Sequence, residues 1–515
     1  MASPASSADS HRRVTLKARE ISDLLPGSQI SGAADVEIKG VVYDSRKAGL
    51  GFLFVALRGH AVDGHSYIPL AINSGASALL VQDDWQGQLP GNIAIIKVAD
   101  TRGALAAASA AFYNYPSRAL QVYAVTGTNG KTSTTILIES ILCVAGIKTG
   151  IIGTLGAKIG DEEVALSNTT PESCDLQQLF ARMRDSGVQA VAMEASSHAL
   201  SQHRMDYTEV DTAIFTNLTQ DHLDYHHTME DYFQAKQRLF TEFPLHTKKD
   251  FVSAVNIDDP WGREHLAYAV GGRLVTFGSA ADAMVHFSEV RYGPSGTAFS
   301  LDCSQGSIRV ELSLGGLFMA YNAMSAAAAC LERGVAISDV KAGLEAVRSV
   351  PGRFELINYG QEFVVIVDYA HTPDGLENVL SSARKVSEGR VIAVFGCGGD
   401  RDPAKRPMMG EIAVRLADIP ILTSDNPRSE DPAAIVSDVM SGIPSAEKVI
   451  VKLDRRKAIE EACRLAQAGD VVVVAGKGHE TYQIFADCTI HFDDREIVRE
   501  TLQRVNKPIQ NGASR

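Results

Sequence analysis

The chain has 515 residues, of which 45% are hydrophobic and 22% are charged, and its formal net charge is −13. This length predicts several domains, and the acidic balance argues against nucleic acid as a main partner. No apolar run is long enough for a membrane helix, so we expect no membrane insertion. The seven cysteines are scattered without a CxxC pair, which indicates neither a zinc site nor a disulfide framework and fits a reducing cytoplasm.

Both ends of the chain are predicted to be tails. The start, MASPASSADSHRR, is rich in Ala and Ser and lacks the apolar core of a secretory signal. A frayed tail or the remnant of a plastid transit peptide is expected there. The final ten residues, NKPIQNGASR, predict disorder.

The first region, residues 1–118, predicts a small domain of short strands and turns, such as VEIKGVVYDSR and GFLFVAL. A helix is expected over residues 101–114, and Tyr115-Pro116-Ser117 marks a linker.

The second region, residues 119–350, begins with an apolar strand, LQVYAV, which runs into the turn TGTNGKTS and an apolar helix. Strand, glycine-rich turn and helix form a phosphate-binding unit. Further strands at QAVAMEAS and TAIFTNL alternate with helical stretches, which favours a doubly wound, mostly parallel sheet. Residues 284–314 predict antiparallel strands, and YNAMSAAAACLERG predicts a helix.

The third region, residues 351–515, follows a break at SVPG and alternates again between strands and helices. Its strands are FVVIVDYA, RVIAVFGCGG, IPILTSD and DVVVVAGKG. The sequence therefore predicts an α/β protein of three domains, with a central P-loop ATPase-type doubly wound sheet and a C-terminal Rossmann-like domain.

The turn between the first central strand and its helix carries the sharpest chemical signal. Its glycines let backbone N–H groups approach phosphate oxygens, and the helix N-terminus favours negative charge. Lys131 is expected to bridge the β- and γ-phosphates, and the Thr132 hydroxyl to bind Mg²⁺. The GxxxxGK[ST] pattern would need a glycine where Val125 stands, so this is not a standard Walker A loop. The predicted ATP-binding residues here are Gly127, Thr128, Asn129, Gly130, Lys131, Thr132 and Ser133.

TGTNGKTS resembles the phosphate loop of the Mur ligase family, which shares a superfamily with the folylpolyglutamate synthetases. The resemblance extends across nearly the whole chain. It implies an ATP-dependent carboxylate–amine ligase of peptidoglycan synthesis. ATP would phosphorylate the D-glutamate side chain of UDP-MurNAc-L-Ala-D-Glu, and the amine of meso-2,6-diaminopimelate would then displace phosphate. We expect a cytoplasmic monomer that binds these small molecules.

The resemblance also implies a magnesium centre. It assigns metal contacts to Glu194 in MEASSHAL and His222 in NLTQDHLDYH, beside Thr132. A histidine is an unusual ligand for this hard cation, which prefers oxygen. Lys236 in DYFQAKQRLF matches a family lysine that CO₂ converts into a carbamate, an anionic oxygen ligand. Lys131, His222 and Lys236 form the expected catalytic set.

The remaining assignments follow the family motifs. Four residues match positions that complete the ATP site: Asn322, Arg353, Asp368 and His371. The UDP-MurNAc-dipeptide is expected to contact DSR, GHAVDGH, NTTP and SSHALSQHR through Ser45, His60, Asn168, Thr169, Thr170, Ser196, Gln202 and Arg204. Two departures from the family pattern are Ala61, where a glutamine is frequent, and Met319, where an asparagine is usual.

The motif DNPR indicates the amino-acid substrate. It follows the strand IPILTSD, at the strand end where open α/β sheets bind ligands. The guanidinium of Arg428 can grip the distal carboxylate of diaminopimelate, which lysine lacks, and Glu480 suits the distal ammonium. The expected contacts are Arg401, Asp425, Asn426, Pro427, Arg428, Gly476 and Glu480.

Several other functions share part of this pattern. A lysine-adding Mur ligase or a folylpolyglutamate synthetase would differ at SSHALSQHR and DNPR. A non-catalytic plastid relative in a transcription complex would carry a long extension and a damaged catalytic set. A kinase, GTPase or ATPase motor could carry an isolated P-loop but would not need the C-terminal motifs.

Overall fold

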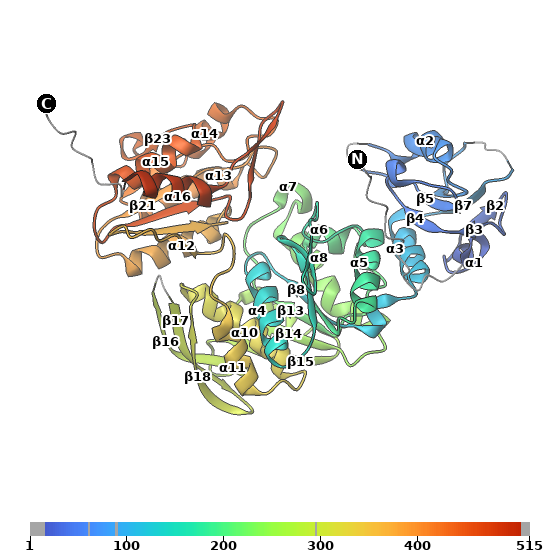
Figure 1. Cartoon of the computed structure of the whole chain (residues 1–515), viewed down its shortest axis with the longest axis horizontal. Helices are drawn as coiled ribbons and strands as arrows, with labels where there is room; N and C mark the ends of the chain where they lie inside the picture. The colour runs from blue at the N-terminus through green and yellow to red at the C-terminus, as the bar shows by residue number, and fades with distance from the viewer. Residues whose placement is uncertain (1–15, 60–61, 88–90, 294–295, 506–515) are drawn as a thin grey trace, which may run out of the picture.

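The computed structural model describes residues 16–59, 62–87, 91–293 and 296–505. Three α/β domains follow one another along the chain and are seen as separate blue, green-to-yellow and orange-to-red bodies in Figure 1. Both predicted tails lie outside the described residues. Within the described ranges, no helix combines the length and apolarity needed to span a bilayer.

The first domain is built on a five-stranded sheet in the order β2-β7-β6-β5-β4, with β2 antiparallel to β7 and the other pairs parallel. Helix α3 begins at the cap Asp100, whose carboxylate accepts two backbone N–H groups, and packs its small apolar residues into the core. The elements are β1 (Leu16–Lys17), α1 (Ala18–Asp23), β2 (Gln29–Ser31), β3 (Glu37–Ile38), β4 (Gly40–Val42), β5 (Phe52–Val55), α2 (Ile68–Asn73), β6 (Ala78–Gln82), β7 (Ala94–Val98) and α3 (Thr101–Phe112).

The predicted linker is a short 3₁₀ helix, η3 (Pro116–Ala119), entered by Tyr115 with a left-handed φ of 46°. The ammonium of Lys249 donates to the carbonyls of Ser117 and Leu120, at 2.8 and 2.6 Å. The connection between the first and second domains is therefore tied to the central domain rather than free.

The central domain contains an eleven-stranded sheet in the order β11-β10-β9-β12-β8-β13-β14-β15-β16-β17-β18. The pairs from β9 to β16 are parallel and the outer pairs antiparallel, as predicted for a mostly parallel sheet with antiparallel strands near residues 284–314. The strands are β8 (Gln121–Thr126), β9 (Thr149–Gly153), β10 (Gly156–Ile159), β11 (Glu162–Val164), β12 (Ala190–Glu194), β13 (Thr212–Phe215), β14 (Val252–Asn256), β15 (Arg273–Gly278), β16 (Val285–Gly293), β17 (Gly296–Cys303) and β18 (Gly306–Leu312).

Helices cover both faces of this sheet, because its inner strands are apolar on both sides. On β8, Tyr123 and Val125 join the core beneath α4 and α10, whereas Val122 and Ala124 join the core beneath α5 and α8. The helices are α4 (Lys131–Val144), α5 (Ser173–Asp185), α6 (Ser197–Ser201), α7 (Leu223–His226), α8 (Met229–Thr241), α9 (Phe243–His246), α10 (Leu317–Leu331) and α11 (Ile337–Ala346).

The third domain has a six-stranded sheet in the order β19-β20-β24-β21-β22-β23, parallel except for the β19–β20 pair. One hydrophobic cluster runs from the central domain through Val350, Phe354 and Ala370 into this domain, so the two are packed together. The elements are β19 (Glu355–Leu356), β20 (Val364–Asp368), α12 (Pro373–Val386), β21 (Val391–Phe395), α13 (Lys405–Leu416), β22 (Ile419–Leu422), α14 (Pro432–Met440), β23 (Ile450–Val451), α15 (Arg455–Leu465), β24 (Val471–Ala475), β25 (Tyr482–Ile484), β26 (Thr489–His491) and α16 (Asp494–Val505).

Candidate active site

The phosphate loop lies between β8 and α4, as predicted, and two of its glycines have no room for a side chain. A Cβ on Gly127 would lie 1.9 Å from the hydroxyl of Thr216, and one on Gly130 would lie 2.3 Å from the amide oxygen of Asn322. Gly130 also has a φ of 87°, which L-residues rarely adopt. The loop is thus held against two neighbouring elements, and Asn322 from α10 lies directly beside it.

Lys131 begins α4 and folds back over the loop, where its ammonium donates to the carbonyls of Gly127 and Thr128, each at 2.9 Å. Burial lowers the pKa of Lys131, and the nearby guanidinium of Arg353 lowers it further. A bound phosphate would offer this ammonium stronger, charged acceptors than the two carbonyls.

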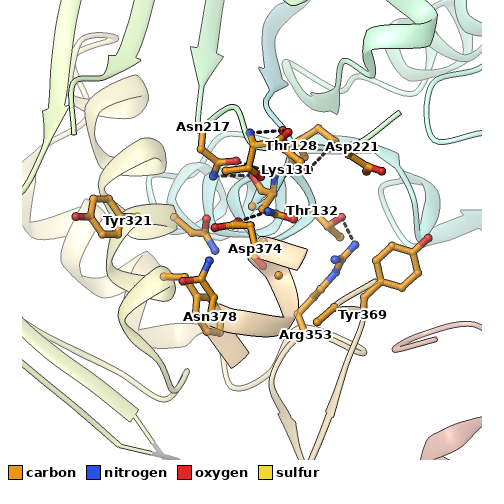
Figure 2. A pocket seen from close by; sticks show the side chains of 18 of the residues that line it. Thr128, Lys131, Thr132, Asn217, Asp221, Tyr321, Arg353, Tyr369, Asp374 and Asn378 are labelled. Atoms are coloured by element: carbon orange, nitrogen blue, oxygen red, sulfur yellow. Dashed lines mark hydrogen bonds between the residues drawn. The ribbon is translucent and has the colours of Figure 1, made fainter. Parts of the chain in front are cut away.

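The side chain of Thr132 contacts one residue of its own domain and one of the third domain. Its hydroxyl donates to Glu194 Oε1 at 3.0 Å and accepts a hydrogen bond from Arg353 Nη2 at 3.1 Å, drawn as a dashed line in Figure 2. Arg353 belongs to the third domain, and its guanidinium lies 4.4 Å from the ring centroid of Tyr369. The Nε of Arg353 is buried without a partner among the described residues, so this cation has donor capacity left for a ligand.

Glu194 ends β12 and is almost fully buried. Its carboxylate also accepts the backbone N–H of Thr154 at 2.8 Å and the Thr154 hydroxyl at 3.1 Å. No group of three His, Cys, Asp or Glu side chains suited to a metal occurs in the described residues. One carboxylate and one hydroxyl still fit magnesium, which commonly takes one or two carboxylates and completes its shell with phosphate and water.

Lys236 on α8 is only 1% exposed, and its Nζ donates to the carbonyl of Gly127 at 2.9 Å. The ammonium lies 4.3 Å from the ring centroid of Tyr232. Burial, and then the charge of Lys131, hold the pKa of Lys236 well below its ordinary value. The neutral amine that this favours is the form that reacts with CO₂, so the position fits a carbamate.

His222 lies in the left-handed region, with a φ of 55°, just before α7. Its ring is 4.8 Å from that of His198, and its Nε2 is 3.3 Å from the carboxylate of Asp221. Burial lowers the pKa of His222 to about 3, although the neighbouring carboxylate of Asp221 acts in the opposite direction. The imidazole is therefore neutral near pH 7, the form in which it can bind a metal.

These groups line a cavity of about 570 Å³ between the central and third domains. Figure 2 shows side chains of both domains facing the same space, among them Thr132, Asp374 and Asn378. The amide of Asn129 in the phosphate loop donates to Asp374 on α12 at 2.7 Å. Ten of the eleven residues predicted to bind ATP line this cavity, and Gly127 does not. The ten are Thr128, Asn129, Gly130, Lys131, Thr132, Ser133, Asn322, Arg353, Asp368 and His371.

A second cavity, of about 350 Å³, adjoins the first. It brings together predicted dipeptide residues of the central domain and predicted amino-acid residues of the third domain. Its lining includes Asn168, Thr169, Thr170, Ser196, Arg204, Arg401, Asp425, Asn426, Arg428, Gly476 and Glu480. Six residues line both cavities: Thr169, Ser196, Asp221, His222, Tyr369 and His371.

The third-domain wall of this second cavity is built at the carboxyl ends of parallel strands. Asn426, after β22, donates to Glu480 at 2.8 Å and accepts from the buried Lys477 at 3.1 Å. Asp425 Oδ2 is buried without a hydrogen-bond partner among the described residues. Arg428 has a left-handed φ of 52°, and its Nη1 donates to the carbonyl of Gly399 at 2.7 Å.

The central-domain wall presents Arg204, whose guanidinium is held on three sides. Its Nη1 donates to the carbonyl of Thr170 at 3.1 Å and its Nη2 to Gln202 at 2.8 Å. Glu172 lies 3.0 Å from its Nε and 3.4 Å from Arg102 of the first domain. This cation is fixed in place before any substrate arrives.

Some predicted residues lie elsewhere. Ser45 is buried in the first domain and lines neither cavity, and His60 lies outside the described residues, as does Ala61. Gln202 and Pro427 line neither cavity, although Gln202 accepts a hydrogen bond from the lining residue Arg204. Sequence reasoning missed Asp221 and Lys405, whose contact forms only when the central and third domains are docked. It also missed Lys477, whose contacts with Asn426 and Glu480 lie within the third domain.

Comparison with known proteins agrees with this geometry. Three family models match the chain: "Mur ligase family, catalytic domain" over residues 37–120, "Mur ligase middle domain" over 125–330 and "Mur ligase, glutamate ligase domain" over 352–478. The chain belongs to the Mur ligase family of ATP-dependent ligases.

Two relatives that match nearly the whole chain share one name within the Mur ligase family. UDP-N-acetylmuramoyl-L-alanyl-D-glutamate–2,6-diaminopimelate ligase of Geobacillus kaustophilus is 45% identical over 483 residues, 93% of this chain and 98% of that protein. The protein of the same name from Geobacter metallireducens is 42% identical over 95% of this chain and 99% of its own length.

Solved structures share the fold. A diaminopimelate ligase structure is 32% identical, with a TM-score of 0.66, and covers 96% of this chain and 100% of its own. MurF from Acinetobacter baumannii has a TM-score of 0.63 at 22% identity and covers 96% of this chain and 99% of its own. A folylpolyglutamate synthase from Mycobacterium tuberculosis, complexed with ADP and AMPPCP, has a TM-score of 0.61 at 19% identity and covers 72% and 91%. At these lower identities the likeness shows the fold alone.

Proposed function

We propose that this ligase adds meso-2,6-diaminopimelate to UDP-MurNAc-L-Ala-D-Glu at the expense of ATP, in peptidoglycan synthesis. One observation carries the proposal: a phosphate-loop cavity and a second cavity lined by arginines and carboxylates share a wall of six residues. A carboxylate activated in the first cavity would thus be presented directly to an amine in the second. Relatives with the corresponding name are about as long as this chain.

In the first half-reaction, the D-glutamate carboxylate attacks the γ-phosphorus of ATP, and ADP leaves. Lys131 would exchange its carbonyl partners for the β- and γ-phosphates, and Arg353 would bring a second cation from the third domain. Preorganised cations of this kind stabilise charge that spreads over the transferring phosphoryl oxygens. Asn322, beside Gly130, would contact adenine, and Asp368 and His371 would complete the nucleotide site.

We place magnesium against Thr132, Glu194 and His222, with Lys236 as a carbamate completing the oxygen ligands. When bound, the metal would neutralise phosphate charge and the carbamate would supply an anionic ligand. The support is the fit of the residues: a buried carboxylate next to a hydroxyl, a neutral imidazole, and a buried amine of lowered pKa.

Diaminopimelate would occupy the second cavity with its distal carboxylate on Arg428 and Arg401. Its distal ammonium would pair with Glu480, and Asp425, whose Oδ2 is buried without a hydrogen-bond partner among the described residues, would lie nearby, so that the other amino group stays free to act as the neutral nucleophile. Asn426, Pro427 and Gly476 would shape the pocket around it. A lysine substrate would leave the arginines without their carboxylate, and this disfavours the lysine-adding alternative.

The UDP-MurNAc end of UDP-MurNAc-L-Ala-D-Glu is proposed to reach the first domain. Ser45 and His60 would contact the UDP-MurNAc portion, while Asn168, Thr169, Thr170, Ser196, Gln202 and Arg204 would hold the dipeptide portion. We place the domain boundaries at residues 118 and 350. We further propose a cytoplasmic monomer, in keeping with a need for ATP and seven free thiols.

The test is a reconstituted reaction with the purified protein, ATP, magnesium and UDP-MurNAc-L-Ala-D-Glu, in which phosphate release is followed as diaminopimelate is added. We expect release to require all three substrates and mass spectrometry to identify the tripeptide product. ATP hydrolysis that ignores the nucleotide-sugar and the amino acid would instead indicate a simple ATPase.

A further inference from the structure

A buried cation that the proposed roles leave unused lies beside the junction of the two cavities. Lys405 is the first residue of α13, its side chain is only 5% exposed, and it lines the second cavity. Within the described parts of the chain, its ammonium has one ionic partner, Asp221 Oδ1 at 3.8 Å. No hydrogen bond from its Nζ is formed within those residues. A lysine this deeply buried normally has fuller pairing, so its donors are available to something that enters the cavity.

The position of Lys405 differs from that of the other cations. Lys131 and Arg353 line the first cavity, where phosphate is transferred, whereas Lys405 lines only the second. Its partner Asp221 belongs to the wall shared by both cavities and extends from the central domain. Lys405 therefore contacts the wall shared by the two cavities. At this wall, a carbonyl activated in the first cavity must meet an amine bound in the second.

Asp221 is a buried carboxylate that contacts groups of both domains. It is 5% exposed and also faces His222 Nε2 at 3.3 Å and His371 Nε2 at 3.8 Å. Two of its three facing groups, His371 and Lys405, come from the third domain. The carboxylate therefore fixes the ammonium of Lys405 at the domain junction without enclosing its donors. As the first residue of α13, Lys405 lies at the positive end of a helix dipole, which disfavours its charge, so the Asp221 carboxylate is the group that stabilises it.

We propose that Lys405 is a catalytic residue of the second half-reaction, in which its ammonium stabilises the oxyanion of the tetrahedral intermediate. This inference rests on the proposed ligase function. The neutral amine attacks the acyl-phosphate carbonyl, a C–N bond forms, and the carbonyl π electrons move onto oxygen, facing Lys405. The C–O bond to phosphate then breaks, the electron pair leaves with phosphate, and the amine proton ends on it, giving amide and HPO₄²⁻.

The alternative is a purely structural role, in which Lys405 only holds the third domain against Asp221. The two roles predict that loss of Lys405 affects different half-reactions. If Lys405 only holds the two domains together, it is needed to assemble the ATP site, and its loss would affect both half-reactions. A stabiliser of the tetrahedral oxyanion is needed only after the acyl phosphate exists. Preorganised donors to an oxyanion typically contribute about 10²–10³ in kcat.

The experiment separates the half-reactions in Lys405→Met, Lys405→Gln and Lys405→Arg. Acyl-phosphate formation is measured without amino acid, as scrambling of ¹⁸O from the β,γ-bridge to the β-nonbridge position of ATP in the presence of UDP-MurNAc-L-Ala-D-Glu. Ligation is measured as kcat with saturating diaminopimelate. Arg415→Met is the matched control, because it removes an exposed cation from the same helix whose one ionic partner among the described residues is Glu377.

We expect Lys405→Met and Lys405→Gln to lose about 100- to 1000-fold in ligation kcat while isotope scrambling falls far less, with Lys405→Arg intermediate and the control unaffected. Equal loss of isotope scrambling and ligation would overturn the proposal in favour of the structural role, and an unchanged ligation kcat would overturn it outright. If Met or Gln prevents folding, the Arg variant decides, since it keeps the charge but moves its donors. Absence of scrambling in the wild type would instead count against the ligase function itself.

Discussion

Replacement of Arg428 by alanine tests the origin of substrate choice. The guanidinium donates to the carbonyl of Gly399 at 2.7 Å and approaches that of Asn426 at 3.4 Å, leaving further donors for a carboxylate. The backbone at residue 428 has a φ of 52°, which costs alanine about as much as arginine, so the substitution adds no new backbone strain. The expected effect is therefore loss of the side-chain interactions.

The size of the effect follows from the type of contact. Truncating one partner of a buried, hydrogen-bonded charge pair costs about 2–5 kcal/mol. At about 1.4 kcal/mol per decade, this is roughly a 30- to several-thousand-fold loss in kcat/KM for diaminopimelate. The two carbonyls that Arg428 leaves can be hydrated from the cavity and should add little. KM values for ATP and UDP-MurNAc-L-Ala-D-Glu should change much less.

Steady-state kinetics with diaminopimelate and lysine, on both proteins, provides the assay. The mutant should show a smaller preference for diaminopimelate even if lysine remains a poor substrate. Arg428→Lys is the matched control, because it keeps the charge but cannot form paired hydrogen bonds, and it should fall between the two. An unchanged preference in Arg428→Ala would refute Arg428 as the selector.

Three further outcomes are expected. Lys131→Ala should abolish ligation with an unchanged circular dichroism spectrum, and near-normal turnover in the folded variant would remove the phosphate-loop assignment. Lys236→Ala should be nearly inactive and unresponsive to bicarbonate, with partial recovery in short-chain carboxylates; an active enzyme whose intact mass and crystal density show an unmodified lysine would refute the carbamate. Burial lowers the pKa of His226 from about 6.5 to about 4, so its protonation favours the unfolded state. Stability should accordingly fall as pH drops through this range, and His226→Phe should show a shallower fall in thermal melts; an equal slope would contradict the assignment.

The sequence predicts well whatever depends on neighbouring residues. The strand, glycine turn and helix around Lys131 have their predicted places, because apolar periodicity and glycine chemistry are local. The antiparallel strands predicted for residues 284–314 are also present. DNPR and residues 476–480 follow buried strands whose carboxyl ends must share one edge of a parallel sheet, so their convergence on the second cavity could be expected.

The sequence does not predict how the domains dock. Arg353 and Thr132 are 221 positions apart and the Asn129–Asp374 pair is 245 apart, and no spacing rule indicates either contact. Lys405 was missed for this reason: in the sequence it is one more cation at the start of a helix. Its burial and its partner Asp221 arise only when α13 is placed against the central domain. The roles of Lys236 and His222 came from family resemblance, to which the structure adds their surroundings.

A competition reaction tests the central claim most directly. The wild-type protein is given ATP, magnesium, UDP-MurNAc-L-Ala-D-Glu and equal concentrations of meso-diaminopimelate and lysine, and the products are identified by mass spectrometry. The product ratio equals the ratio of the two kcat/KM values, independent of saturation. The arginine-lined second cavity predicts that the diaminopimelate tripeptide dominates by at least roughly 30-fold, the lower bound from one lost charge pair. Equal amounts of both tripeptides, or ADP formed without either, would contradict the account.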